Sequence, residues 1–206
     1  MHYRPPKYDK KFLVIQTASI GDVILSTAVG ESLSQKYPNA QIDYIVKRGN
    51  ERLFDGNPWI NEIIAWDKSN EKYKNMLRII FQIREEKYDA VINLQRFASS
   101  GVFTIFSKAK KTYGFRKNPF SLFFSKSFPH QFKENWHETD RNHQLLSKIV
   151  DEPKAKPALY PTMKEFAIMS QYKTQKYITI TPASLWFTKQ YPIEKWVDFI
   201  QQLDSK

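Results

Sequence analysis

The sequence has no cysteine, which excludes a disulfide framework and thiolate chemistry. No apolar run reaches ~18 residues, so the sequence predicts no membrane-spanning helix, and its start, MHYRPPKYDKK, lacks the apolar core of a signal peptide. Glycine is scarce as well. The loop QTASIGD has one glycine where a dinucleotide fingerprint needs three, and it lacks the Gly-Lys-Ser/Thr of a P-loop. From these absences we expect a cytoplasmic protein without a nucleotide-binding loop of either type.

Positive charge dominates the composition. The chain has 32 basic and 21 acidic residues, a formal net charge of +11. A balance of this kind favours an acidic partner, such as a phosphorylated sugar, a nucleotide, a nucleic acid or an anionic membrane face.

Apolar runs of strand type alternate with segments of helical period, at a spacing typical of parallel strands joined by right-handed crossovers. The predicted fold class is therefore α/β, with a doubly wound, mainly parallel, Rossmann-like sheet. The predicted strands are residues 12–15, 41–46, 62–66, 88–94 and 111–115, and the predicted helices are residues 22–36, 71–86, 95–106 and 137–150.

Asp22 stands where the first strand passes, through a short polar loop, into the first helix. Ligands of doubly wound sheets bind at the carboxyl ends of the strands, where this loop lies. Asp22 has two interpretations: a helix N-cap, with Gly21 easing the turn, or a general base held at the junction. Spacing alone leaves both open.

Residues 108–133 carry seven basic residues and no acidic one, interleaved with phenylalanine. One interpretation is a solvated basic loop whose phenylalanines enter the core. Another is a surface for a phosphorylated, partly apolar molecule at a membrane face. Basic and aromatic residues together also suit single-stranded nucleic acid.

His137, Asp140 and Arg141 share one face at the start of the last predicted helix of this region. His137 and Asp140 are only two potential metal ligands, and the next candidate, His143, lies off that face. The stretch is therefore a poor metal site. We expect a structural or substrate-contact role here, and no metal.

The chain divides into four predicted segments. Residues 1–10 are a leader, residues 11–152 form the first domain, and the proline-rich residues 153–175 are a linker. Residues 176–206 begin a second domain, with a predicted strand at 177–181 and a helix at 192–203. We expect a complete first domain and the start of a second, because one strand and one helix cannot make a two-faced α/β domain.

Four stretches carry a family resemblance, in matching order. They are TASIGDV at 17–23 after a strand, YDAVINLQ at 88–95, HETDR at 137–141, and SLWFTKQYP at 184–192 followed by Trp196. Together they resemble the ADP-heptose:lipopolysaccharide heptosyltransferases, glycosyltransferase family 9, over nearly the whole chain.

The resemblance implies a GT-B fold, with an N-terminal domain for the lipid-linked acceptor and a C-terminal domain for the nucleotide sugar. It implies an inverting transfer without an obligatory metal or other cofactor. Asp22 is then the general base, which takes the proton of the acceptor hydroxyl as that oxygen attacks the anomeric carbon and the nucleoside diphosphate leaves. Ser184 and Lys189 match residues that hold the donor diphosphate, where a lysine and a following helix N-terminus favour negative charge.

The implied partners are a nucleotide sugar of the ADP-heptose type and an anionic lipopolysaccharide or related glycolipid at the inner membrane face, with no nucleic acid. Placement is then cytoplasmic and peripheral to that membrane. The expected acceptor contacts are Ser19, Gln95, Arg116, Lys117 and Arg141.

The sequence departs from the family pattern at three positions and in length. Asn93 stands where aspartate is frequent, Arg96 where glycine is common, and Tyr191 where tryptophan is usual. These departures affect acceptor choice rather than the fold. A chain ending at Lys206 lacks most of the donor domain, so we expect weak binding of the nucleotide sugar.

Three functions follow from these observations. The first is a sugar transferase, and the second is a non-catalytic module that binds an anionic glycolipid. The third, nucleic-acid binding, rests only on charge and aromatic residues. Turnover abolished by Asp22→Ala favours the first, acceptor binding insensitive to Asp22→Ala favours the second, and steeply salt-dependent oligonucleotide binding favours the third.

Overall fold

The computed structural model describes residues 8–131, 134–174, 176–184 and 186–204. They divide into two compact units, Met1–Thr162 and Met163–Lys206, each described here by itself. Most of the predicted leader, residues 1–7, lies outside the described residues, as do Phe132 and Lys133 of the basic segment.

A six-stranded sheet forms the centre of the first unit, and every neighbouring pair of strands is parallel. The strand order is β3-β2-β1-β4-β5-β6, which confirms the predicted doubly wound α/β sheet. The strands are β1 (Lys11–Gln16), β2 (Gln41–Lys47), β3 (Glu62–Trp66), β4 (Ala90–Asn93), β5 (Lys111–Phe115) and β6 (Lys126–Phe128). Strand β6 was not predicted, because three residues, KSF, carry no periodicity.

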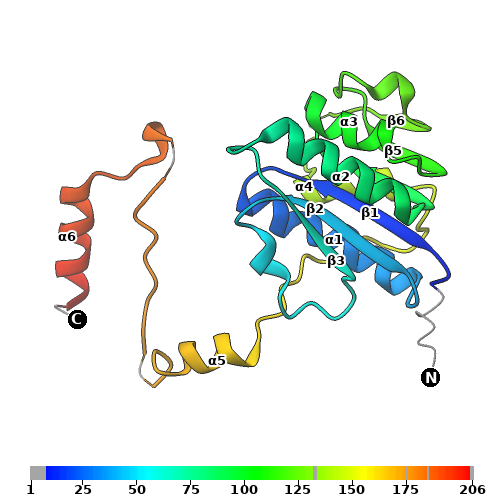
Figure 1. Ribbon diagram of the computed structural model, residues 1–206. Coiled ribbons are helices and arrows are strands. Elements are labelled where there is room, and N and C mark those ends of the chain that lie inside the picture. Colours follow the sequence, from blue (N-terminus) through cyan, green and yellow to red (C-terminus); the bar gives the residue numbers. More distant parts are fainter. Residues whose placement is uncertain (1–7, 132–133, 175, 185, 205–206) are drawn as a thin grey trace. The chain divides into compact units, whose positions relative to one another are not determined.

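Helices cover both faces of this sheet (Figure 1). The segments are α1 (Ile20–Lys36), η1 (Glu51–Phe54), α2 (Lys72–Glu86), α3 (Ala98–Phe106), η2 (Ser121–Phe123), α4 (Glu138–His143) and η3 (Gln144–Leu146), where η marks a 3-10 turn. Helix α1 and η3 pack on one face, whereas α2 and α3 pack on the other. Burial on both faces explains why the central strands are continuous apolar runs rather than alternating ones.

The predicted single helix over residues 137–150 is wrong. Helix α4 ends at His143 and continues as the 3-10 turn η3, after which the chain turns away. Leu145 and Leu146 are both fully buried in the core. The tighter turn places these two consecutive leucines inside, which outweighs the regular α-helical hydrogen bonding that the sequence pattern favours.

The proline-rich segment after η3 lies along α1. The backbone N–H of Ala155 donates to Ser32 Oγ at 3.2 Å, and that of Ala158 donates to Thr27 Oγ1 at 3.0 Å. The Tyr160 hydroxyl donates to the buried carboxylate of Glu31 at 2.8 Å. Residues 153–162 therefore belong to the first unit, although they fall within the predicted linker.

The second unit contains α5 (Met163–Ser170), η4 (Phe187–Lys189) and α6 (Ile193–Asp204). The rings of Tyr191 and Trp196 meet edge to face with centroids 5.3 Å apart, at the start of α6. The predicted strand at 177–181 is wrong: these residues are extended chain with no strand assignment. A strand exists through its hydrogen bonds to a neighbouring strand, and among the described residues none pairs with this segment.

Candidate active site

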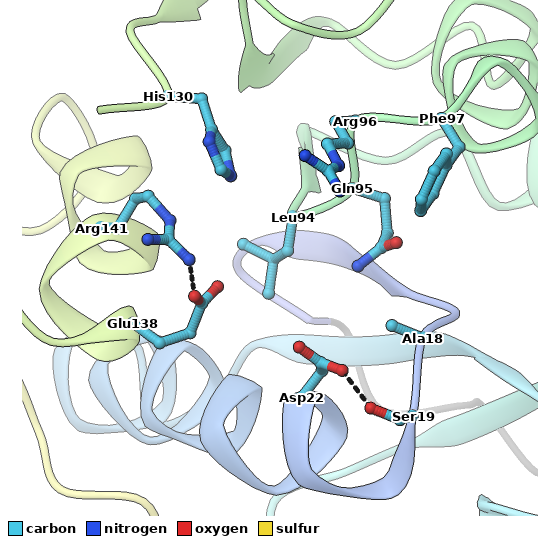
Figure 2. A pocket seen from close by; sticks show the side chains of 10 residues that line it. All are labelled: Ala18, Ser19, Asp22, Leu94, Gln95, Arg96, Phe97, His130, Glu138 and Arg141. Carbon is cyan, nitrogen blue, oxygen red and sulfur yellow. Dashed lines mark hydrogen bonds and ion pairs between the residues drawn. The ribbon is translucent and has the colours of Figure 1, made fainter. Parts of the chain in front are cut away.

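A pocket of about 330 Å³ lies at the carboxyl edge of the sheet (Figure 2). Its lining comes from the segments that follow β1 and β4, together with the chain after β6 and helix α4. The strand order reverses between β1 and β4, and ligands of doubly wound sheets bind at such a switch point. The lining residues are Ala18, Ser19, Asp22, Leu94, Gln95, Arg96, Phe97, His130, Glu138 and Arg141.

Asp22 occupies the first turn of α1 and is partly exposed to the pocket. The helix begins at Ile20 and its N-cap is Ser19, so the interpretation of Asp22 as the N-cap residue is wrong. The Ser19 hydroxyl donates a hydrogen bond to the Asp22 carboxylate, and Figure 2 shows the two side chains together at the pocket wall. Asp22 makes no side-chain cap of the helix end, which leaves its carboxylate available to a ligand.

Two glutamines join the ends of β1 and β4 at the pocket. The Gln95 side chain donates to Gln16 Oε1, which also accepts from the Ala18 N–H at 3.2 Å. The Gln95 backbone N–H donates to Asn93 Oδ1 at 2.9 Å. Both loops that line the pocket are therefore held to the sheet by buried amides.

Asn93 uses both ends of its amide. Its Oδ1 accepts from the backbone, whereas its Nδ2 donates to Thr104 Oγ1 at 2.9 Å on α3. The Thr104 hydroxyl donates its own proton to the Ser100 carbonyl at 2.8 Å. Aspartate has no N–H to donate to Thr104, which gives a physical reason for asparagine at this departure from the family pattern.

Arg141 reaches the pocket from α4. This helix begins with a capping box, in which the His137 N–H donates to the Asp140 carboxylate at 2.8 Å. Arg141 is buried and forms an ion pair with Glu138. Burial lowers the pKa of the Arg141 guanidinium, the carboxylate of Asp22 raises it, and the positive charge of Arg96 lowers it. An arginine remains charged under these influences, so the pocket holds a fixed cation near Asp22.

His130 lines the side of the pocket next to Arg141. Its ring packs edge to face on Phe115, with centroids 4.8 Å apart. Burial lowers the pKa of His130, and the positive charges of Arg141, Lys117 and Arg96 lower it further. The imidazole is therefore neutral at neutral pH, and the pocket wall carries two guanidinium groups, from Arg96 and Arg141, beside it.

This depressed pKa predicts a loss of stability on acidification. The unfolded chain binds a proton at His130 near pH 6.5 and the folded chain does so only at lower pH, so the free energy of unfolding falls as pH drops below about 6.5. The pKa of His143 is also lowered by burial and adds to the same slope. Urea unfolding at about pH 7.5 and about pH 5.5 measures this slope, and His130→Gln is expected to flatten it. An unchanged slope in that variant would contradict the prediction.

The structure gathers half of the predicted site residues at this pocket. Ser19, Asp22, Gln95 and Arg141 line it together. Arg116 and Lys117 follow β5, are exposed, and lie outside the lining, although the charge of Lys117 acts on His130.

Ser184 and Lys189 belong to the second unit. Ser184 Oγ accepts from the Trp186 N–H at 3.3 Å, and the Ser184 carbonyl accepts from the Gln190 side chain at 2.8 Å. Lys189 ends η4 and is exposed. The Leu185 between them lies outside the described residues.

Six lining residues were not predicted as site residues: Ala18, Leu94, Arg96, Phe97, His130 and Glu138. The Arg96 guanidinium lies 5.5 Å from the centre of the Phe97 ring, so the two side chains form a cation–π pair at the pocket mouth. Glu138 belongs to a stretch that carries the resemblance, and Arg96 directly follows another, so the sequence held a signal for both residues. His130 had none, because it follows a short strand in a segment noted only for its charge.

No group of three or more potential metal ligands occurs within the part of the chain that the structure describes. The two carboxylates of the pocket have partners of another kind, since Asp22 accepts from Ser19 and Glu138 pairs with Arg141. The arrangement suits proton transfer at Asp22 beside fixed positive charge.

The fold and this site are those of a Rossmann-like domain with an acid at the β1–α1 junction. The model of glycosyltransferase family 9 (heptosyltransferase) matches residues 76–206, and the chain belongs to this family. It is 23% identical over 197 residues to lipopolysaccharide core heptosyltransferase OpsX of Haemophilus influenzae, an alignment that covers 92% of this chain and 55% of the relative. It is 26% identical over 140 residues to lipopolysaccharide heptosyltransferase 1 of Campylobacter coli, covering 68% of this chain and 40% of the relative.

Solved structures show the same fold. A family 9 glycosyl transferase of Veillonella parvula aligns with a TM-score of 0.78 at 20% identity, covering 96% of this chain and 62% of that one. E. coli ADP-heptose lps heptosyltransferase II aligns with a TM-score of 0.74 at 20% identity, covering 95% and 61%. The chain thus spans about half the length of the curated relatives it matches.

None of the helices described here is both long and apolar enough to cross a bilayer.

Proposed function

We propose that this protein is an inverting sugar transferase of the GT-B type, in which Asp22 acts as the general base. The acceptor hydroxyl gives its proton to the Asp22 carboxylate while its oxygen attacks the anomeric carbon of a nucleotide sugar, and the nucleoside diphosphate leaves from the opposite face. The first unit provides the acceptor side of this reaction, and the second provides part of the donor side.

One observation carries the proposal: the Asp22 carboxylate lines a pocket at the switch point, with Arg141 and Arg96 in the same lining. Ser19 holds the carboxylate by a single hydrogen bond, which leaves acceptor capacity for a substrate hydroxyl. The Arg96 guanidinium offers paired donors to a carboxylate or phosphate of the acceptor, whereas Arg141 is paired with Glu138. A base next to anion-binding groups is what transfer to an acidic sugar acceptor requires.

The names of the relatives support the substrate classes. Curated relatives are lipopolysaccharide heptosyltransferases, and two of the similar solved structures are E. coli heptosyltransferase WaaC with ADP and with ADP-2-deoxy-2-fluoro heptose. We therefore take a nucleotide sugar of the ADP-heptose type as the donor, and a lipopolysaccharide core or related glycolipid as the acceptor. Such an acceptor is anchored in a bilayer, so the protein works peripherally at the inner membrane face.

The direct test is sugar transfer by the protein expressed from its own gene. It is incubated with ADP-heptose and a core lipopolysaccharide that lacks heptose, and the product is detected as a mass increase of the glycolipid together with ADP release. Transfer supports the proposal. Acceptor binding without transfer, unchanged in Asp22→Ala, would support the non-catalytic binding module instead.

Lys189→Ala is expected to raise the KM for the nucleotide sugar at least about tenfold, because a charge-assisted hydrogen bond to a phosphate is worth about 1.5–3 kcal/mol. The acceptor KM should stay unchanged. Initial rates at varied donor and acceptor concentrations measure both. Lys164→Ala, which removes an exposed lysine of α5, is the matched control. Equal effects of the two substitutions would argue against a diphosphate contact of Lys189.

A further inference from the structure

The turn η2 exposes two large apolar side chains next to each other. Leu122 is 92% exposed and Phe123 is 72% exposed, whereas the following Phe124 is buried. Phe124 packs against the backbone at Gly114, where a Cβ atom would come within 2.6 Å of its ring. The turn is therefore fixed to the sheet by Phe124 and presents Leu122 and Phe123 to solvent.

The chain around η2 is basic over a long stretch. No acidic residue occurs between Asp89 and Glu134. Arg116 and Lys117, which lead into the turn, are both exposed. We call Arg116, Lys117, Leu122 and Phe123 the η2 surface. In this surface two exposed apolar side chains, Leu122 and Phe123, follow two exposed cations, Arg116 and Lys117.

The η2 surface adjoins the pocket. The buried side chain of Asn118 donates to the carbonyls of Gln95 at 3.2 Å and Phe97 at 2.9 Å, the loop that lines the pocket. Phe120 lies against α3, where a Cβ atom at Gly101 would come within 2.7 Å of its ring. Figure 1 shows α3, β5 and β6 together at one end of the sheet. Whatever contacts η2 is thus brought close to the pocket mouth.

We infer that the η2 surface docks this protein on an anionic lipid bilayer, with Leu122 and Phe123 inserted at the boundary between headgroups and acyl chains. Apolar side chains inserted at that depth, with cations at the headgroup level, are the means by which soluble domains bind membranes. The inference deepens the proposed function and rests on it, since it supplies the surface that would hold the pocket at a membrane-anchored acceptor.

A bilayer fits these observations better than two other occupants. Single-stranded nucleic acid binds by stacking on aromatic rings, and the more exposed tip residue, Leu122, is aliphatic and offers no ring. A second copy of this chain would place like charges of Arg116 and Lys117 against each other at the interface, which is unfavourable. Anionic lipid complements both the charge and the apolar tip.

Co-sedimentation of the full chain with vesicles tests the inference. The vesicles are phosphatidylcholine alone or phosphatidylcholine with phosphatidylglycerol, and they contain no acceptor or nucleotide sugar. We expect binding to the anionic vesicles that weakens with added salt. Serine substitution of both Leu122 and Phe123 should weaken it at least about tenfold, because burial of one large apolar side chain is worth about that factor or more. Lys117→Ala should weaken it about fivefold.

Leu77 and Phe81 of α2 provide a matched control pair. They are 54% and 63% exposed, and their replacement by serine should leave vesicle binding unchanged. Because the sequence lacks cysteine, Phe123→Cys and Phe81→Cys each create a single thiol for an environment-sensitive fluorophore. The label at 123 should shift to the blue on vesicle binding, and the label at 81 should not.

Three results would overturn the inference. One is absence of binding to anionic vesicles by the wild-type chain. The second is equal loss of binding in the Leu77/Phe81 and Leu122/Phe123 variants. The third is unchanged vesicle binding in the Leu122/Phe123 variant together with the loss of another interaction. That interaction would be either a dimer, which the substitutions dissociate, or oligonucleotide binding, which they abolish. Vesicle binding needs no catalysis, so these results are separate from the outcome of the sugar-transfer assay.

Discussion

Asp22→Asn is expected to lower kcat for sugar transfer by about 10²–10⁴-fold, the range that a general base contributes. Asparagine keeps the size of the side chain and can still accept a hydrogen bond from Ser19, but it cannot take the proton of the acceptor hydroxyl. An interaction that acts only in the transition state lowers kcat and kcat/KM equally and leaves the KM values unchanged. Initial rates of ADP release at varied donor and acceptor concentrations measure kcat and both KM values.

Asp55→Asn is the control for this experiment. Asp55 is an exposed aspartate beside η1, and the same chemical change there should leave kcat unaltered. Ser19→Ala separates proton transfer from positioning, because it leaves the Asp22 carboxylate in place without its hydrogen bond; its loss should be much smaller than that of Asp22→Asn. If Asp22→Asn kept kcat within about threefold of the wild type, well below the effect of losing a general base, Asp22 would have no such role.

Asn118→Ala is expected to lower the free energy of unfolding by about 2–4 kcal/mol, because it leaves buried backbone groups without partners. The Asn118 side chain is buried and donates to the carbonyls of Gln95 and Phe97, while its Oδ1 accepts from the Phe120 N–H at 3.0 Å. The midpoint of urea unfolding at constant m-value measures the loss. Because the freed loop carries pocket residues, acceptor binding should weaken in the same variant.

Two further variants test whether the loss of stability comes from the hydrogen bonds of Asn118 rather than from replacing any asparagine by alanine. Asn70→Ala removes an exposed loop asparagine and should change stability by no more than about 0.5 kcal/mol. Gly101→Ala would place a Cβ atom 2.3 Å from Asn118 Oδ1, so it displaces Asn118 without removing it and should cost about 1–3 kcal/mol. A change below about 0.5 kcal/mol for Asn118→Ala, the ordinary range for a surface substitution, would show that water replaces its hydrogen bonds.

Local sequence patterns predicted the wrong secondary structure in two segments whose conformation depends on residues distant in the sequence. Residues 177–181, YITIT, read as a strand from β-branched and aromatic residues, yet strand structure depends on a neighbour that local sequence does not specify. Residues 137–150 read as one helix, yet burial of Leu145 and Leu146 in the core ends the regular helix at His143. In both segments a tertiary requirement outweighs intrinsic propensity.

The sequence by itself determined the parallel α/β sheet and the place of Asp22. Apolar runs separated by amphipathic helices are local patterns, and a residue that follows the first strand must lie at the carboxyl edge of the sheet. Only the tertiary structure decided what faces Asp22. His130 and Arg141 are more than a hundred residues away in sequence, and they reach the same pocket because the strand order and the path of the chain after β6 bring them there. That path depends on many weak non-local contacts, such as His130 on Phe115 and Asn118 on the loop at Gln95, and no single stretch of sequence encodes their sum.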